Sequence, residues 1–256
     1  MTLHDQSACA TLLDIEGTTT PLDFVYRALF PYARSHLRQF LSRHLLFPEV
    51  GADIAELHEE HRTDTEQGLN PPRLCDNTPE EELASVAEYI EWLMDRDRKS
   101  TSLKSLQGRI WKEGYKRGEL RGQVFDDVPR ALERWQKQEK KISIFSSGSV
   151  LAQKLLFTHT TAGDLSQHIS HYFDTTVGSK TDKHSYQKIA SVLHLLPSEI
   201  VFISDVSTEL DAAQSAGMHT LLCLRPGNHP QPASTHRLIQ TLDEVFPQRT
   251  TGSRLP

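Results

Sequence analysis

Short runs of apolar residues alternate along much of the chain with longer segments in which apolar positions recur every three or four residues. The short runs cover residues 10–13, 142–145, 200–203 and 220–224, with a further extended piece at 172–174. Each run is about as long as a strand that is buried on both faces of a sheet. Segments with helical spacing lie between the later runs, at residues 128–140, 150–156 and 185–196. The alternation predicts an α/β fold with a parallel sheet, in which residues 220–224 form the last strand.

Residues 21–122 differ from the rest because no strand pattern interrupts them. Apolar residues recur at helical spacing at positions 26, 29, 30, 33, 37, 40 and 41, and again at 83, 86, 87, 90, 93 and 94. Thr78, Pro79 and Glu81 form a favourable helix start, because threonine caps helices and proline suits the first turn. We therefore predict a core made of residues 1–22 and 122–256, and an all-helical insertion of residues 23–121 that lies as a lid over the site.

The first predicted strand ends in a group of polar residues, Asp14, Glu16 and Gly17, followed by three threonines. Open α/β sheets place their chemistry at the carboxyl ends of the strands. Asp14 is therefore a candidate nucleophile, since an aspartate can accept a phosphoryl group as an acyl phosphate. Glu16 is a candidate acid or base over the same crevice, and Gly17 lets the backbone turn away. The alternative is an ordinary polar turn at the end of a strand.

Two later predicted strands also end in polar residues. Ser146 and Ser147 follow residues 142–145 and precede a helix, where hydroxyls and backbone N–H groups can hold an anion. Serine capping of that helix is the alternative. Asp205 follows residues 200–203, and Mg²⁺ prefers a few carboxylates together with phosphate oxygens and waters. These residues predict an anion site and a metal ligand at one edge of the sheet.

The loop between those two strands supplies a lysine, which is either Lys180 or Lys183. A lysine of this kind can bind phosphate, and the alternative is a lysine that is only solvated. Glu209 and Asp211 lie on the opening turns of the helix after Asp205, where the helix dipole favours acids. We interpret these two acids as structural.

The composition limits the classes of partner. The 256 residues carry a formal net charge of −6, so no basic field favours nucleic acid or an anionic membrane. No stretch approaches the length of a membrane span, and the first residues lack a signal-peptide pattern. Cys9, Cys75 and Cys223 are odd in number and lack zinc-binding spacing, which is typical of reduced thiols. We expect a cytoplasmic protein that binds neither nucleic acid nor a membrane.

The four polar groups in this order, Asp14-x-Glu16, Ser146-Ser147, Lys180 and Asp205, resemble the four motifs of the haloacid-dehalogenase-like phosphohydrolases. Within that superfamily the chain is similar to the enolase-phosphatase family of methionine salvage. The narrower resemblance rests on residues 14–20, 24–25, 29–32, 107–108, 111, 146–150, 172–175, 185–186 and 225–228. Glutamate at position 16 marks this group, since most relatives carry aspartate there. The resemblance also chooses Lys180 over Lys183, because residues 177–179 match the run before the family's lysine.

The resemblance implies a fold and a cofactor. The fold is a Rossmann-like three-layer parallel-sheet core with an inserted all-helical cap domain. The cofactor is one Mg²⁺ per chain, held by the Asp14 carboxylate, a main-chain oxygen of Glu16 and Asp205. The resemblance also favours a monomer.

The implied reaction has two stages. The substrate, a 2,3-diketo-5-methylthiopentyl 1-phosphate, is enolised and then loses phosphate to give the acireductone 1,2-dihydroxy-3-keto-5-methylthiopentene. In this scheme Asp14 is the nucleophile, and Glu16 is first acid and then base. Ser146, Ser147 and Lys180 hold the phosphate oxygens.

Several alternatives stay open at this point. The base for enolisation is Glu16, Lys180 or a residue of the cap. Phe24, Trp111 and Tyr115 either line a pocket for the methylthio tail or pack in the core of the cap, which is the commoner role of aromatic residues. The alternative functions are a phosphatase of the same superfamily that acts on another small phosphate monoester, and an inactive member that only binds. A dehalogenase would need neither the second acid nor the metal acid.

Overall fold

The computed structural model describes residues 8–75, 77–229 and 234–247 of the chain. It divides into two compact units, Met1–Val25 with Arg121–Pro256, and Tyr26–Leu120, which are described separately. The first five residues, which bear on the expected lack of a signal peptide, lie outside the described ranges. No helix within those ranges is long and apolar enough to cross a membrane.

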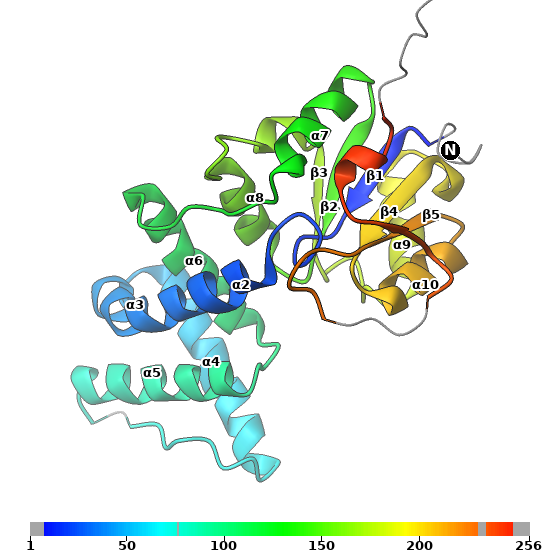
Figure 1. Cartoon of the computed structure of the whole chain (residues 1–256). Helices are drawn as coiled ribbons and strands as arrows, with labels where there is room; N and C mark the ends of the chain where they lie inside the picture. Colours follow the sequence, from blue (N-terminus) through cyan, green and yellow to red (C-terminus); the bar gives the residue numbers. More distant parts are fainter. Residues whose placement is uncertain (1–7, 76, 230–233, 248–256) are drawn as a thin grey trace, which may run out of the picture. The chain divides into compact units, whose positions relative to one another are not determined.

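The first unit is built on a six-stranded parallel sheet with the strand order β3-β2-β1-β4-β5-β6 (Figure 1). Its strands are β1 (Ala10–Leu13), β2 (Lys141–Phe145), β3 (His171–Phe173), β4 (Ile200–Ser204), β5 (His219–Cys223) and β6 (Arg237–Ile239). In the register of the sheet, Leu13 lies opposite Ile144 of β2 and Ile203 of β4. The residues that follow these three neighbouring strands therefore meet at one edge of the sheet.

Helices cover both faces of this sheet and give it three layers (Figure 1). On one face, α9 (Lys183–Leu193) and α10 (Ser207–Ser215) pack Tyr186 and Leu210 into a buried cluster with Leu12 and Phe202. On the other face, α7 (Asp127–Lys137) packs against β2 and buries Trp135 completely. A shorter helix, α8 (Val150–Thr158), packs against β3. The predicted three-layer α/β fold is confirmed.

Two elements differ from the sequence prediction. Residues 220–224 do not form the last strand, because β6 pairs with β5 in parallel beyond it. β6 has three residues, and its first two are exposed, so no apolar run marks it in the sequence. The helix expected at 185–196 is shifted towards the N-terminus as α9, since Asp182 caps its start and His194 ends it in a left-handed conformation with φ 56°.

The described residues of the second unit form helices and connecting loops. The four long helices are α3 (Phe30–His44), α4 (Pro48–Glu66), α5 (Pro79–Asp95) and α6 (Thr101–Arg117), and a π-helical turn at Val25–Leu29 joins α3 to the short α2 (Leu22–Phe24). As predicted, α5 begins at Pro79, and the Thr78 side chain accepts a hydrogen bond from the backbone N–H of Glu81. The helical nature of residues 26–120 thus follows from their apolar spacing and caps.

The aromatic side chains that were candidates for a ligand pocket lie buried. Phe24, Trp111 and Tyr115 are 3%, 8% and 4% exposed, and the Trp111 indole N–H donates to the backbone oxygen of Leu29. The Trp111 ring also lies 6.2 Å from that of Phe30, so Trp111 packs against the start of α3.

A buried carboxylate ties three segments of the helical unit together. Asp64 is 1% exposed, and it accepts hydrogen bonds from the Tyr89 hydroxyl at 2.8 Å and from Arg98 Nη2 at 2.7 Å. A carboxylate at such a depth is stable only when it is paired and hydrogen-bonded. Asp64 therefore makes the stability of this unit sensitive to either partner.

Replacing Tyr89 with Phe removes the hydroxyl and leaves one oxygen of the Asp64 carboxylate without its donor. We expect the free energy of unfolding to fall by about 2 kcal/mol, the usual worth of a hydrogen bond to a charged group. Urea unfolding followed by circular dichroism measures the change. Tyr26→Phe is the matched control, because Tyr26 is 62% exposed. Equal unfolding midpoints for the two variants would contradict this account.

Candidate active site

Asp14 lies directly after the central strand, and its carboxylate is nearly buried. Its side chain is fixed by the backbone N–H of Ile15, which donates to Oδ1 at 2.8 Å. The chain then turns sharply, because the N–H groups of Thr18, Thr19 and Thr20 all donate to the backbone oxygen of Ile15. We call residues 15–20 the motif loop. Asp14 therefore lies at the carboxyl end of β1, directly before a hydrogen-bonded turn, as its place after a buried strand predicts.

Lys180 forms an ion pair with the carboxylate of Asp14. Its Nζ is 2.6 Å from Asp14 Oδ1 and 2.7 Å from Glu209 Oε2, and its side chain is 7% exposed. The hydroxyl of Ser204, the last residue of β4, lies 3.3 Å from Asp14 Oδ2 and 3.0 Å from Glu209 Oε2. One ammonium group and one hydroxyl thus link the two acids.

The loop before α9 is built to present Lys180 rather than Lys183. The Tyr186 hydroxyl donates to the backbone oxygen of Lys180 at 2.6 Å, and Ser185 Oγ donates to that of Ser179 at 2.7 Å. Gly178 has φ +139°, and a Cβ there would lie 2.3 Å from Ser185 Oγ, so only glycine fits. By contrast, Lys183 is exposed at the first position of α9.

Ser146 brings the second acid of the motif loop into the same group. Its hydroxyl is buried at the end of β2 and donates to Glu16 Oε2 at 3.2 Å, while it accepts from the backbone N–H of Gly148 at 3.1 Å. Ser147 is exposed next to it in the turn. The direct contacts therefore form two pairs, Asp14–Lys180 and Glu16–Ser146. Glu16 lies close enough to the first pair for the charges of Asp14 and Lys180 to act on its pKa.

Backbone N–H groups at the start of α8 that could bind an anion already donate to side chains of the protein. Ser149 caps the helix by accepting from the N–H of Ala152, and the N–H of Val150 donates to Asp174 Oδ2 at 3.1 Å. Serine capping, the alternative interpretation of this segment, thus applies to Ser149. Ser146 and Ser147 lie before the cap, where their hydroxyls remain candidates for phosphate binding.

Burial and crowding of carboxylates shift the ionisation of the site. Burial, and then the negative charge of Asp14, raises the pKa of Asp205 to about 7. The same two causes raise the pKa of Glu209 to about 7 and the pKa of Glu16 above its usual value. Although burial disfavours its charge, the carboxylates of Asp14 and Glu209 raise the pKa of Lys180 further, so it stays protonated. The four acids thus outnumber the one lysine, and the site favours a bound cation.

Within residues 8–75, 77–229 and 234–247, no group of three or more His, Cys, Asp or Glu could hold a metal ion. The donors predicted from the sequence are two carboxylates, those of Asp14 and Asp205, and a main-chain oxygen of the motif loop. Gly17, at φ +70°, lies so close to Asp205 that a Cβ would be 2.3 Å from its Oδ2. Two carboxylates and a main-chain oxygen suit Mg²⁺, which keeps several waters and takes substrate phosphate oxygens as well. The predicted donor set therefore fits this ion.

Comparison with known proteins decides the family. A family model described as haloacid dehalogenase-like hydrolase matches residues 10–217 of the chain. The chain belongs to the haloacid dehalogenase-like hydrolase family. The match includes Asp14, Lys180 and Asp205, and it confirms the resemblance that the four motifs indicate.

Relatives that match nearly the whole chain place it in the enolase-phosphatase E1 branch of these hydrolases. The enolase-phosphatase E1 of Synechococcus elongatus is 48% identical over 93% of this chain and 98% of the relative. That of Sorangium cellulosum is 44% identical over 94% of this chain and 98% of the relative. The solved structure of UTR4 from Saccharomyces cerevisiae has a TM-score of 0.74 and 32% identity, and covers 91% of this chain and 98% of that one.

The sequence interpretation missed one member of this hydrolase site. Glu209 is on the opening turn of α10, but its carboxylate contacts Lys180 and Ser204 rather than serving only the helix dipole. The available signal was its position four residues after Asp205, which puts both acids at the same end of the helix. Asp211, the other acid interpreted as structural, pairs instead with His236 and does not contact the described site residues.

Replacing Lys180 with Met leaves Asp14 and Glu209 buried without their shared counter-charge. We expect the free energy of unfolding at pH 8 to fall by about 3–5 kcal/mol, as when one partner of a buried ion pair is removed. Urea unfolding of the core measures the change. Lys183→Met, three residues away on the surface, is the control and should unfold like the wild type. Similar midpoints for both variants would show that the Lys180 contacts contribute nothing to stability.

Proposed function

We propose that this haloacid dehalogenase-like hydrolase converts 2,3-diketo-5-methylthiopentyl 1-phosphate into the acireductone 1,2-dihydroxy-3-keto-5-methylthiopentene and phosphate, a step of methionine salvage. The relatives named enolase-phosphatase E1 support the proposal along nearly the full chain. The observation that carries it is the contact of Lys180 with Asp14 at the sheet edge to which Ser146 also brings Glu16. This arrangement suits phosphoryl transfer to a carboxylate with an acid beside it.

In the proposed transfer, a carboxylate oxygen of Asp14 attacks phosphorus and the bond from phosphorus to the enol oxygen breaks. Glu16, whose pKa is raised, donates its proton to that oxygen. Water then attacks the phosphoaspartate after giving a proton to Glu16, which releases phosphate and restores Asp14. Glu16 thus serves as acid in the first half and as base in the second.

The charge on the transferring phosphoryl group is stabilised by fixed groups of the core. In the proposal, Lys180 and the hydroxyls of Ser146 and Ser147 hold its oxygens, because positioned charges and donors are the main contribution a protein makes to this reaction. Asp14, the main-chain oxygen of Glu16 and Asp205 would hold one Mg²⁺. Bound there, the ion would neutralise the phosphate and let the anionic Asp14 approach it.

The remaining parts of the proposal follow the sequence resemblance. In the proposal, residues 23–121 are the cap inserted into a core made of residues 1–22 and 122–256. The chain is a cytoplasmic monomer whose partner is the phosphorylated diketone.

Replacing Asp14 with Asn removes the proposed nucleophile. We expect phosphate release from the diketone phosphate to fall about 10³-fold or more, the scale seen when covalent nucleophiles are removed. The enol should still form, because enolisation needs no attack on phosphorus. An ultraviolet time course of enol absorbance, with phosphate assayed in parallel and Mg²⁺ present, measures both stages. Asp97→Asn, at an exposed acid in the helical unit, is the control.

Two outcomes of that time course would change the proposal. If the wild type hydrolyses simple phosphate monoesters but leaves the diketone phosphate untouched, the chemistry stands and the substrate is another small monoester. If Asp14→Asn releases phosphate at the wild-type rate, Asp14 is not the nucleophile.

Replacing Glu16 with Gln keeps the main-chain oxygen but removes the acid and base. With the diketone phosphate we expect a loss of about 10²–10⁴-fold, the usual contribution of general acid–base catalysis. With p-nitrophenyl phosphate, whose leaving group needs no proton, the variant should release a burst of nitrophenol equal to the enzyme concentration and then stall. Stopped-flow absorbance at pH 7 measures this burst. If the rates with both substrates fall equally and no burst appears, the assignment of Glu16 as acid and base is wrong.

A further inference from the structure

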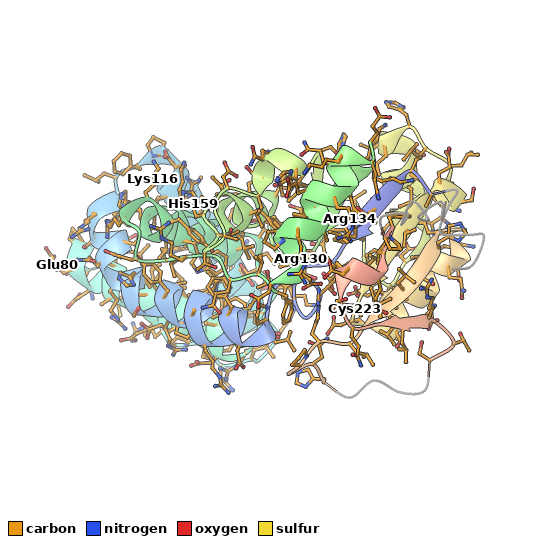
Figure 2. The ribbon with its side chains drawn as sticks, turned by 45° about the horizontal axis from the view of Figure 1, so that its top comes forward. Glu80, Lys116, Arg130, Arg134, His159 and Cys223 are labelled. Atoms are coloured by element: carbon orange, nitrogen blue, oxygen red, sulfur yellow. The ribbon has the colours of Figure 1, made fainter. Side chains whose placement is uncertain are left out.

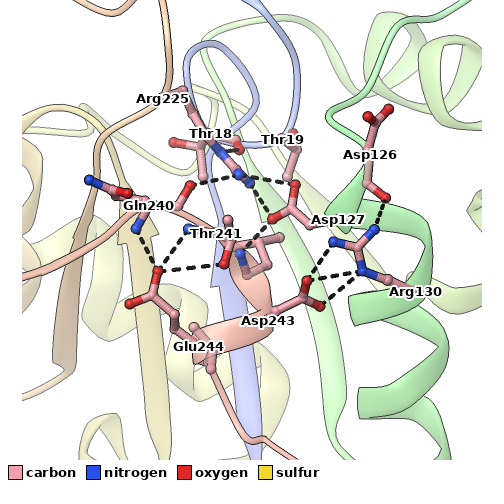
Figure 3. A network of polar contacts seen from close by, with 12 residues as sticks. Thr18, Thr19, Asp126, Asp127, Arg130, Arg225, Gln240, Thr241, Asp243 and Glu244 are labelled. Atoms are coloured by element: carbon pink, nitrogen blue, oxygen red, sulfur yellow. Dashed lines mark hydrogen bonds and ion pairs between the residues drawn. The ribbon is translucent and has the colours of Figure 1, made fainter.

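The turn after β5, Arg225–Pro226–Gly227–Asn228, reaches the motif loop with two of its side chains. Asn228 Nδ2 donates to the backbone oxygen of Gly17 at 2.9 Å, and Arg225 Nε donates to that of Thr18 at 3.0 Å. The backbone N–H of Phe125 donates to the next oxygen, that of Thr19, at 3.0 Å. Three consecutive carbonyls of the loop therefore each receive a donor from elsewhere in the core. Figure 3 shows the donor that Arg225 supplies to Thr18.

Arg225 is itself held rigidly. Its side chain is 3% exposed, and both terminal nitrogens pair with the two oxygens of Asp127, at 3.0 and 2.9 Å. Nη1 also donates to the backbone oxygen of Gln240, and the guanidinium lies 4.5 Å from the centre of the Phe125 ring. Asp127 is fixed in turn, because it accepts the N–H of Leu242. The hydrogen bonds of Nη1 to Asp127 and Gln240, together with the ion pair of Nη2 with Asp127, define the direction of Nε.

Anchoring the C-terminal segment does not by itself account for Arg225. Arg134 of α7 already binds that segment, through Asp243 and the backbone oxygens of Leu242 and Val245. Figure 2 places Arg134 and Arg130 along the same helix. What distinguishes Arg225 from Arg134 is its hydrogen bond to the motif loop, and a buried arginine–aspartate pair is costly to maintain for packing alone.

The part of the loop that these donors hold is the part that faces the proposed cation site. Gly17 approaches Asp205, and the Oδ1 atom of Asn228 lies 3.1 Å from where a Gly17 Cβ would be. The carbonyls of Gly17 and Thr18 follow directly after Glu16. A shift of the loop would therefore move the Glu16 side chain, its main-chain oxygen and the spacing to Asp205 together.

We propose that Arg225 and Asn228 are positioning residues, which hold the Thr18 and Gly17 carbonyls and so set the place of Glu16 and of the oxygen donors for the divalent cation. The inference rests on the proposed function for the role of Glu16. Their described hydrogen bonds to the site go to the motif loop and not to Ser146 or Lys180, the groups proposed to hold phosphate.

The test uses the full chain with Asn228→Ala and Arg225→Lys, and with Arg134→Lys as the matched control. Isothermal titration of Mn²⁺ into substrate-free protein measures cation affinity, and steady-state hydrolysis of the diketone phosphate and of p-nitrophenyl phosphate gives kcat and KM. For the two loop-contact variants we expect Mn²⁺ affinity and kcat each to fall about 10–100-fold, the range for residues that orient metal ligands. KM should stay within about threefold of the wild type. Arg134→Lys should match the wild type in all three quantities while it loses stability in urea.

Three results would overturn the inference: wild-type Mn²⁺ affinity and kcat in both loop-contact variants, a loss confined to KM, or the same losses in Arg134→Lys. If Arg225→Lys does not fold, Asn228→Ala decides alone, because that residue is only half-buried. A wild type that cleaves p-nitrophenyl phosphate but not the diketone phosphate would refute the proposed substrate. The Mn²⁺ titrations and p-nitrophenyl phosphate kinetics would still decide the positioning role.

Discussion

The buried ion pairs of Lys180 with Asp14 and Glu209 are the interaction on which the rest of the core depends. Lys180 contacts Asp14 and Glu209 at 2.6 and 2.7 Å, and all three side chains are largely removed from water. Each charge alone would be costly to bury, so each is acceptable only while the others are in place. The three residues come from the end of β1, the loop before α9, and α10. These contacts therefore form only when β1, the loop before α9 and α10 are all in their native positions on the sheet.

The same group of charges explains why the site suits a cation and a phosphate together. Burial, and then the negative charge of Asp14, raises the pKa of Asp205 to about 7, although Lys180 opposes the shift. A core that served stability alone would balance these acids or replace them with apolar residues. The surplus negative charge lowers the stability of the folded protein, and a divalent cation bound at the proposed site would offset that cost. The fold thus sacrifices some stability at the position where phosphoryl transfer needs charge.

The sequence was sufficient to predict the fold and family, because the strands are short buried runs and the motif residues follow them directly. Asp14, Ser146 and Asp205 could be grouped since parallel strands end at one edge. β6 could not be predicted, because a three-residue edge strand carries no apolar pattern. Glu209 was misjudged because its position has an equally good local explanation. Arg225 was visible only as part of a family motif, since the carbonyl it holds is 207 residues away.

The position of β1 in the sheet has a consequence for how the protein is made. Of the six strands of the sheet β1 is synthesised first, yet its neighbours are β2 and β4, with the helical unit synthesised between them and β1. A strand whose four residues are all buried in the folded protein therefore stays unpaired while a unit with its own local contacts can already form. The turn that holds the motif loop comes later still. The segment that carries the proposed nucleophile is thus translated before every strand that pairs with it and before the turn that holds its loop, and a nascent chain at that stage exposes a strand that chaperones can bind.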